Sequence, residues 1–453
     1  MRFLDRFKET DRLQKAIQIN KSKLIVLYGR RRCGKSTLIR HLLQKKDVYF
    51  MADQSDPTIQ RKLFAEAISE KIEGFDKVTY PAWESLLTTL NNVLKEHITI
   101  CIDEFPYLVK NTPELPSVLQ KLIDAKKNTM YHIILCGSSQ QMMHGIVTDS
   151  SEPLYGRADE IIKLQPMTAY WLQQSLGCSP TEAVEEFSVW GGVPRYWELR
   201  KERPDFGTAL KEIILDHHSI LHDEPIRLFL DDMRESVQAY SILSVIGSGC
   251  NRLSEIAGRL GKPATQLSRP IDNLIELGYL KRDIPFGESP KSSKKSIYRI
   301  SDPFMNFYFT FIVPNGSRLE AGLTDKVYSE IKTKMSHYVA SVWENLSRMA
   351  IPYMEIDGIS FNTASRWWGN NSKGEPMEID VIAESTDKKT LLIGECKWSD
   401  KNDTDRLMHE LERKSRLLPF AEKKKVILAL FLKEAKHYKP VIFTPEKVIR
   451  LLR

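Results

Sequence analysis

Residues 29–36 constrain the fold of this chain more than any other segment. They read GRRRCGKS, follow the apolar run KLIVLY at residues 23–28, and precede the helix-like segment LIRHLLQ. The apolar run is typical of a buried parallel strand. A glycine loop between a strand and a helix is the context that the phosphate-loop pattern GxxxxGKS/T requires. We therefore expect an α/β sheet with a phosphate-binding loop. The alternative is a chance match in an ordinary strand-turn-helix unit.

The residue types of this loop suit a nucleoside triphosphate. Glycines let backbone N–H groups curl around phosphates, Lys35 reaches the β and γ oxygens, and Ser36 offers a hydroxyl to Mg²⁺ at the start of the helix. We expect ATP and Mg²⁺ as cofactors. The expected nucleotide-binding residues of the loop are Gly29, Arg30, Arg31, Arg32, Cys33, Gly34, Lys35, Ser36 and Thr37.

A second strand-like run supplies the acids that such a site needs. Residues 97–104 read HITICIDE, so two carboxylates follow an apolar strand. Asp103 is expected to hold Mg²⁺ through water, and Glu104 to orient and deprotonate the attacking water. A plain helix-capping turn is the alternative. Farther on, PLYGR places Arg157 in a loop. A cation there would stabilise the phosphoryl transition state, in cis or on a neighbour's nucleotide. The alternative is an arginine that simply faces solvent.

Taken together, these stretches resemble the archaeal-type ATPase family, a branch of the STAND-like AAA+ ATPases that also occurs in bacteria. The matching stretches are FLDRFKETDRL, LYGRRRCGKSTLI, CIDEFPYL, LCGSS, PLYGR and GGVPRYW, in that order. The resemblance implies an AAA+ parallel sheet with a helical lid. It also implies that Ser138, with Ser139 in reserve, contacts the γ-phosphate or the water, a plain turn being the alternative. The segment near Phe3 and Arg6 and the turn with Pro194 would lie near the adenine or the lid.

Helical spacing and charge single out the middle of the chain. After the helical lid we predict three helices, at residues 240–246, 253–260 and 264–277, and then a two-stranded hairpin. Three helices and a hairpin make a winged helix, with residues 265–269 opening the recognition helix. Between Arg252 and Arg299 ten bases stand against five acids, a balance of +5, and the hairpin tip ESPKSSKKS is basic. This favours duplex DNA as a partner, although winged helices also serve as protein-binding modules.

The last third of the chain carries spaced acids on strand-like runs. Alternation in MEIDVIA (residues 377–383) places Asp380 on one strand face, and LLIGECKW (residues 391–398) places Glu395 and Lys397 together on a neighbouring strand. With Glu344 from an upstream helix, they form a candidate nuclease site in which Asp380 and Glu395 would hold Mg²⁺. This looks like the PD-(D/E)XK nuclease fold, which the family resemblance also implies. A domain that persists as a DNA-binding or interaction platform, without cleavage, is the alternative.

These expectations give an α/β multidomain protein with four parts. They are a P-loop AAA+ core (1–164), a helical lid (165–235), a winged helix (236–312) and an α/β restriction-endonuclease-like domain (313–453). The length of 453 residues leaves room for about three domains with cores of their own.

Composition adds a few exclusions. The N-terminus lacks the apolar core of a signal peptide, and no apolar run reaches the roughly 20 residues that cross a bilayer, so we expect a cytoplasmic protein without membrane contact. Six scattered cysteines without a CxxC pattern are expected as reduced, buried thiols, and no zinc site is predicted. The histidines of residues 217–225 are expected on the solvated face of a helical segment. The net charge of +7 permits nucleic-acid binding without requiring it.

The leading hypothesis is an ATP-hydrolysing, DNA-associated AAA+ protein with a candidate metal-dependent nuclease domain. The alternative is a nucleotide-controlled signalling switch. In that case the winged helix and the C-terminal domain would bind protein partners and cut nothing.

Overall fold

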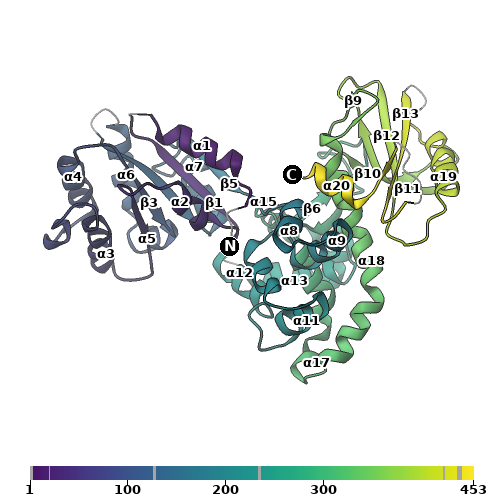
Figure 1. The fold of residues 1–453 in the computed structure, drawn as a ribbon, viewed down its shortest axis with the longest axis horizontal. Coiled ribbons are helices and arrows are strands. Elements are labelled where there is room, and N and C mark those ends of the chain that lie inside the picture. Colours follow the sequence, from purple (N-terminus) through teal and green to yellow (C-terminus); the bar gives the residue numbers. More distant parts are fainter. Residues whose placement is uncertain (1–3, 20, 126–128, 233–235, 422–423, 436–440) are drawn as a thin grey trace. The chain divides into compact units, whose positions relative to one another are not determined.

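The computed structural model describes residues 4–19, 21–125, 129–232, 236–421, 424–435 and 441–453. The chain forms two compact units (Figure 1). Unit 1 comprises residues 1–166 and 230–234, and unit 2 comprises residues 167–229 and 235–453.

Unit 1 is built on a parallel sheet, as the sequence predicts, and this sheet has five strands. Its strand order is β2-β3-β4-β1-β5. The strands are β1 (Leu24–Gly29), β2 (Val48–Met51), β3 (Ile98–Asp103), β4 (Tyr131–Gly137) and β5 (Glu160–Leu164). Every residue of β1, β3 and β4 is buried. Central parallel strands are covered on both faces, which explains why they appear in the sequence as continuous apolar runs.

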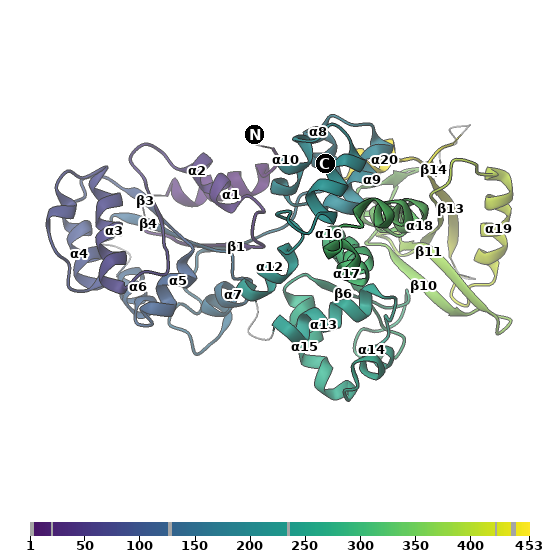
Figure 2. The same ribbon diagram turned by 90° about the horizontal axis from the view of Figure 1, so that it is seen from below.

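Helices cover both faces of this sheet. Figure 2 shows α1 (Phe7–Ile17) and α2 (Lys35–Leu42) on one face, opposite α5 (Phe105–Asn111), α6 (Leu115–Asp124) and α7 (Gln140–Thr148). The second face also carries α3 (Pro57–Ser69), the turn η1 (Phe75–Lys77) and α4 (Trp83–Val93). Aromatic rings hold this layer together, since the Phe64 ring meets Phe50 at 5.1 Å and Trp83 at 5.4 Å between centroids. The strand-loop-helix unit around residues 29–36 is thereby held on a packed core.

Close strand packing explains the glycine that begins the loop. Gly29 has φ 154°, and a Cβ added there would lie 2.4 Å from the carbonyl oxygen of Leu164 on β5. We expect Gly29→Ala to destabilise the protein by about 1–3 kcal/mol, because the backbone must shift to relieve the clash. Gly145→Ala is the matched control: it lies inside α7, its Cβ meets nothing within 4 Å, and it should be neutral or slightly stabilising. Thermal unfolding midpoints of the two variants check this, and equal midpoints would contradict it.

Unit 2 begins with a helical group in the region predicted as a lid. The helices are α8 (Ala169–Leu176), α9 (Pro180–Trp190), α10 (Pro194–Lys201), α11 (Phe206–Leu210), the π-helical turn η2 (Lys211–Leu215) and α12 (Glu224–Asp232), of which residues 230–232 are assigned to unit 1. The histidines of residues 217–222 lie in turns between η2 and α12, so their predicted helical placement is wrong.

The three predicted helices and the hairpin follow. They are α13 (Ser236–Gly247), α14 (Leu253–Leu260), α15 (Ala264–Glu276), β6 (Leu280–Asp283) and β7 (Ile297–Ile300). The strands β6 and β7 are antiparallel. On α15 the buried side chains Leu267, Ile271 and Leu274 recur at helical spacing, which leaves the opposite face to solvent.

Aromatic helical turns lead into the last part of unit 2. They are α16 (Pro303–Phe307), η3 (Tyr308–Ile312), η4 (Val313–Asn315) and α17 (Gly316–Glu320), followed by the long helix α18 (Thr324–Ala350). A turn, η5 (Ile351–Tyr353), and the short pair β8 (Glu355–Ile356) and β9 (Ile359–Ser360) come next. The Trp343 indole of α18 donates a hydrogen bond to the carbonyl of Phe431, 3.0 Å away, and anchors this helix on the sheet that follows.

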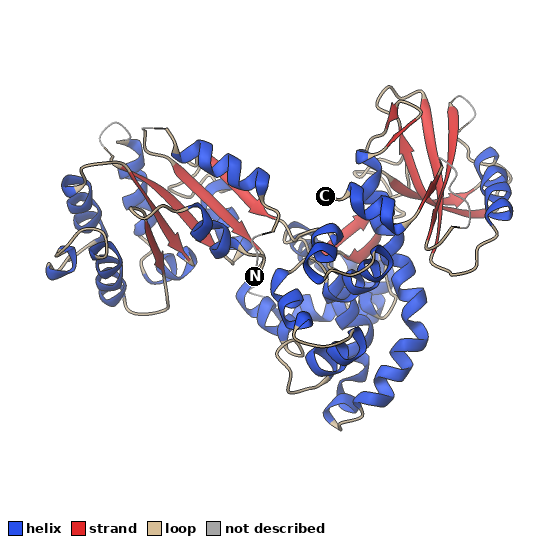
Figure 3. Cartoon of the chain, in the orientation of Figure 1, coloured by secondary structure: helices blue, strands red, loops and turns tan. Residues whose placement is uncertain are grey.

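The second sheet is mixed, with the order β10-β11-β12-β13-β14. Its elements are β10 (Ser365–Asn370), β11 (Pro376–Glu384), β12 (Thr390–Lys397), β13 (Lys425–Leu432) and β14 (Ile442–Phe443), with α19 (Thr404–Arg416) and α20 (Pro445–Leu451). The first three strands are antiparallel, whereas β12, β13 and β14 are parallel. Figure 3 shows this sheet in red beside the blue helices of the same unit. Among the described residues, no helix is both long enough and apolar enough to cross a bilayer.

Candidate functional site

The loop of residues 29–36 curls at the carboxyl end of β1 and opens helix α2. Arg32 and Gly34 have positive φ values of 66° and 90°, which turn the backbone inward before the helix begins. The ammonium of Lys35 is buried and donates to the carbonyls of Gly29 at 2.9 Å and Arg30 at 3.1 Å. A buried cation, the helix N-terminus and the curled N–H groups make this loop suited to an anion.

Asp103 lies beside the loop at the end of the neighbouring strand β3. Its carboxylate accepts hydrogen bonds from the Ser36 hydroxyl at 2.7 Å and the Tyr49 hydroxyl at 2.6 Å. Burial raises the pKa of Asp103, but these donors outweigh that effect and the net pKa is lowered. Asp103 is therefore a carboxylate at neutral pH. Tyr49 is an addition that the motif did not reveal: it lies on β2, whose parallel pairing with β3 brings it to this edge.

Glu104 and Ser138 are brought together at the ends of β3 and β4. Glu104 has φ 53°, a left-handed conformation that directs the chain into α5. Its carboxylate accepts a hydrogen bond from the Ser138 hydroxyl at 2.9 Å and from the Ser138 N–H at 3.3 Å. Ser139, the reserve candidate, is the N-cap residue of α7, and its side chain makes no capping hydrogen bond.

The N-terminal segment reaches the loop through Arg6. Its guanidinium is buried and donates to the carbonyl of Cys33 at 3.1 Å. The family resemblance places Arg6 near the adenine or the lid, and the structure places it directly on the loop backbone. Phe3 lies outside the described residues.

Arg157 does not lie with these groups. Helix α7 carries the chain back to the edge where the parallel strands begin, because a parallel crossover must return there. Arg157 precedes β5 at that edge, and its Nε donates to the Asp124 carboxylate at 3.0 Å. The phosphate loop lies at the opposite edge. This position disfavours action of Arg157 on its own chain's nucleotide, while action on a neighbour's nucleotide stays a prediction.

The other predicted loop residues differ in their exposure. Arg30 and Cys33 are buried, Arg32 is half-buried, and Arg31 and Thr37 are exposed. Pro194 is the first residue of α10 and belongs to unit 2. Its contact with adenine stays a prediction.

A second cluster of charged residues lies in the mixed sheet of unit 2. Continuing the β11/β12 register by one step places Asp380 opposite Glu395. The two carboxylate oxygens of Glu395 accept from Lys397 at 2.8 Å and from Lys414 at 2.9 Å. Burial raises the pKa of Glu395, but the two lysines outweigh this and lower it. Lys414 comes from α19 and was not foreseen, because only the helix-to-sheet packing brings it close.

The predicted strand alternation fails at Asp380. The β10/β11 pairing shifts by one residue between Ser365 and Trp367, so β11 carries one extra residue between Ile379 and Ile382. Both isoleucines consequently pack in the same core cluster, although strict alternation would place them on opposite faces. The irregularity falls at Asp380, whose carboxylate accepts the N–H of Cys396 at 2.9 Å.

Glu344 on α18 completes the cluster, as proposed from the sequence. Its carboxylate lies 3.6 Å from the Arg348 guanidinium and 3.9 Å from that of Arg366. Burial, followed by the charge of Asp380, raises the pKa of Glu344 to about 7. Burial and the charge of Glu395 also raise the pKa of Asp380. Within the described ranges no three His, Cys, Asp or Glu side chains are grouped so as to hold a metal ion.

Comparison with known proteins adds sequence relatives. A family model described as an ATPase domain predominantly from Archaea matches residues 3–198, and one described as archaeal and bacterial proteins of unknown function matches residues 308–408. An uncharacterized protein of Methanocaldococcus jannaschii is 34% identical over 424 residues, which make up 92% of each chain. An uncharacterized ATP-binding protein of the same organism is 44% identical over 46 residues, 10% of this chain and 78% of that protein.

Solved structures show only a distant likeness. The Aeropyrum pernix ORC2 protein, in complexes with ADPNP and ADP, has a TM-score of 0.43 and 12% identity over 73% of this chain and 96% of its own. A STAND protein with a tetratricopeptide repeat sensor from Pyrococcus horikoshii has a TM-score of 0.35 and 14% identity over 76% of this chain and 50% of its own. At these scores the likeness supports no conclusion about site or mechanism.

Proposed function

Since the chain belongs to the archaeal-type ATPase family, we propose that it binds Mg-ATP in the loop of residues 29–37 and hydrolyses it. One observation carries the proposal. The ends of three adjacent parallel strands bring together a buried lysine, a hydroxyl hydrogen-bonded to a carboxylate, and a second carboxylate held by a serine. These groups can bind a triphosphate, hold a hard cation and activate a water.

The donor chemistry at Ser36 and Asp103 fits Mg²⁺. A hydroxyl and a carboxylate are the hard oxygen ligands that Mg²⁺ prefers, and they lie 2.7 Å apart. Bound there with the nucleotide, Mg²⁺ would neutralise charge on the phosphate oxygens. Lys35 would exchange its two loop carbonyls for phosphate oxygens, and the loop N–H groups would hold the phosphates in place.

Glu104 is the group we assign to the attacking water. The Ser138 hydroxyl and N–H donate to its carboxylate, which keeps it at the strand edge. From there it would orient the water and accept its proton.

Loss of the loop lysine tests the binding part of the proposal. We expect Lys35→Ala to weaken Mg-ATP binding at least about tenfold, because one charge-assisted hydrogen bond contributes about 1.5–3 kcal/mol. Isothermal titration calorimetry measures this directly. The control is Lys62→Ala on α3, whose side chain is 74% exposed. If wild type, Lys35→Ala and Lys62→Ala bound Mg-ATP with equal affinity, the loop would not be the ATP-binding site.

We further propose that α13, α14, α15 and the β6–β7 hairpin form a winged helix that binds duplex DNA. Not all of the ten bases counted in the sequence are both exposed and without an ion pair. Lys281 is largely buried, Lys295 pairs with Glu288 at 2.7 Å, and Arg299 lies 3.4 Å from Asp283. Six exposed bases form no ion pair with a described residue, and they suit a phosphate backbone: Arg259, Lys262, Arg269, Arg282, Lys291 and Lys294.

Salt dependence tests DNA binding. Duplex binding should weaken as salt rises, and Arg269→Gln or Lys294→Gln should reduce the slope of log K against log salt by about 0.9 for each phosphate that the variant no longer neutralises. Fluorescence anisotropy with a labelled duplex measures the slope. The exposed Lys332 of α18 provides the control variant, Lys332→Gln, which should leave the slope unchanged. No binding at low salt would instead favour a winged helix that binds protein in a nucleotide-controlled switch.

For the mixed sheet of unit 2 we propose a PD-(D/E)XK-like domain. The supporting observations are the opposed Asp380 and Glu395, the lysine two residues further on, and the nearby acid of α18. Two carboxylates suit Mg²⁺, but both oxygens of Glu395 are bound by lysines. These two lysine contacts favour the alternative, a domain that binds DNA or a partner and does not cleave nucleic acid.

A further inference from the structure

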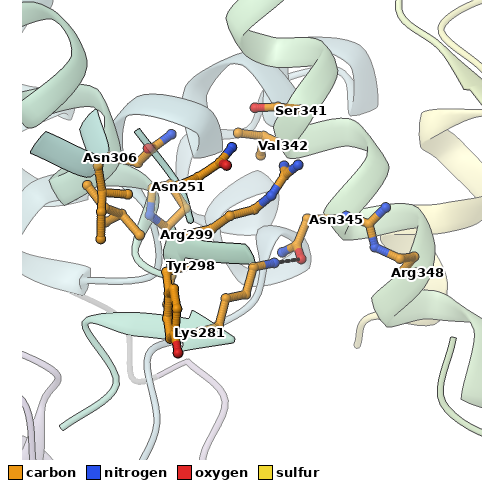
Figure 4. A pocket seen from close by; sticks show the side chains of 13 residues that line it. Asn251, Lys281, Tyr298, Arg299, Asn306, Ser341, Val342, Asn345 and Arg348 are labelled. Carbon is orange, nitrogen blue, oxygen red and sulfur yellow. Dashed lines mark hydrogen bonds between the residues drawn. The ribbon is translucent and has the colours of Figure 1, made fainter. Parts of the chain in front are cut away.

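A cavity of about 230 Å³ lies within unit 2, between the β6–β7 hairpin and helix α18 (Figure 4). Cations, amides and hydroxyls make up most of its polar lining, among them Lys281, Arg299, Arg348, Asn251, Asn345 and Ser341. No carboxylate occurs among the described residues that line it. A lining with three cations and no carboxylate suits an anion.

Several cations gather at this cavity, although burial and mutual repulsion destabilise their charged forms. Lys281 is largely buried, and its ammonium donates to the Asn345 carbonyl at 2.5 Å (Figure 4). Burial lowers the pKa of Lys281; Asp283 and Glu344 oppose the shift, whereas the nearby guanidinium groups of Arg348 and Arg366 add to it. Like charges in a buried place destabilise each other unless a counter-charge is present.

Arg299 provides an independent indication. Its Nε is buried and makes no hydrogen bond within the described part of the chain. The nearest carboxylate, Asp283, lies 3.4 Å away, and its Oδ2 is likewise left without a hydrogen bond. Buried polar atoms normally form hydrogen bonds, so this guanidinium nitrogen, ion-paired but without a hydrogen bond, can donate to a ligand oxygen in the cavity.

We propose that this cavity binds a phosphate group, presented by a small phosphate ester or by the terminal phosphate of a nucleic-acid strand. Arg299 and Lys281 of the hairpin and Arg348 of α18 would surround its oxygens, because planar guanidinium groups and an ammonium match phosphate. The volume is below the roughly 300–1,000 Å³ of pockets that hold drug-sized ligands, so the cavity admits a phosphate and little more. The site is separate from the loop of residues 29–37 and does not depend on it.

A phosphate bound in the cavity would also affect the carboxylate cluster of the mixed sheet, because Arg348 contacts both. This guanidinium also donates to the carbonyl of Asp380 at 2.8 Å and lies 3.6 Å from the Glu344 carboxylate. An anion in the cavity would compete with Glu344 for Arg348. Occupancy of the cavity is thereby linked to the carboxylate cluster of the mixed sheet.

The test uses the full chain carrying Lys35→Ala, which weakens phosphate binding at the loop. Calorimetry with inorganic phosphate and ribose 5-phosphate should show saturable binding, and adding Arg299→Gln should weaken it at least about tenfold. Adding Lys332→Gln, at an exposed position of α18, should leave it unchanged. A duplex with and without a 5′-phosphate identifies the source: preference for the phosphorylated end with no binding of ribose 5-phosphate assigns the site to a strand terminus.

Lys281→Met separates ligand binding from a structural role. It should keep or raise the thermal unfolding midpoint, because it relieves repulsion between buried cations, and it should also lose phosphate binding. The proposal is overturned if no phosphate probe binds saturably to the Lys35→Ala protein. It is also overturned if Arg299→Gln and Lys281→Met leave binding unchanged. Since the loop is weakened throughout, and Arg299 and Lys281 lie outside it, neither result depends on the proposed ATP site.

Discussion

Glu104→Gln is expected to slow ATP hydrolysis by about 10²- to 10⁴-fold while leaving Mg-ATP binding nearly unchanged, because the amide cannot accept the proton of the attacking water. The geometry supports a selective effect. Glutamine can still accept the Ser138 hydrogen bond that Glu104 accepts at 2.9 Å, so the side chain should keep its place. Phosphate release at saturating ATP measures the rate, and calorimetry measures the affinity.

Two further variants sharpen this test. Ser138→Ala should lower kcat less than Glu104→Gln, since it removes a group that positions the carboxylate and keeps the carboxylate itself. Glu114→Gln, an exposed acid just before α6, is the control and should hydrolyse ATP as the wild type does. If Glu104→Gln retained full turnover, another residue would have to activate the water.

The parts of the ATP site that could be predicted are those that the chain carries in local patterns. A strand, a glycine loop and a helix are contiguous, and so are an apolar strand and its terminal acids. The carboxyl ends of parallel strands meet at one edge, so Ser36, Asp103 and Ser138 could be expected near one another before their contacts were known. The five-stranded parallel sheet of unit 1 agrees with that reasoning.

The parts that could not be predicted depend on long-range packing. Arg157 follows the right strand in sequence, but α7 returns the chain to the opposite sheet edge and Arg157 pairs with Asp124. Tyr49 and Lys414 reach Asp103 and Glu395 only through strand pairing and helix packing. No motif encodes these contacts.

The irregular strand pairing at Asp380 also depends on long-range packing and could not be predicted. Alternating residues predict a regular strand, and an inserted residue is visible only when the partner strand β10 is in place. At this irregularity the Asp380 carboxylate interacts electrostatically with both Glu344 and Glu395.

Asp380→Ala and Glu395→Ala are expected to lower any metal-dependent cleavage of DNA at least about 100-fold, because each removes a carboxylate that would hold the metal, and metal ions supply several kcal/mol to such transition states. Cleavage of plasmid and single-stranded DNA with Mg²⁺ or Mn²⁺ gives the measurement. Glu355→Gln, an exposed acid on β8, is the control and should cut as the wild type does.

Substitution of Lys414 distinguishes a domain that cleaves nucleic acid from one that does not. Its ammonium binds one oxygen of Glu395 at 2.9 Å, while Lys397 binds the other at 2.8 Å. A metal must displace at least one of these lysines, so Lys414→Met should increase Mn²⁺ affinity, measured by calorimetry, with Lys397 still in place for catalysis. If neither the wild type nor Lys414→Met cuts any substrate or binds Mn²⁺, the two lysines act as permanent counter-charges for Glu395. The mixed sheet is then an interaction platform whose buried ion cluster serves the fold.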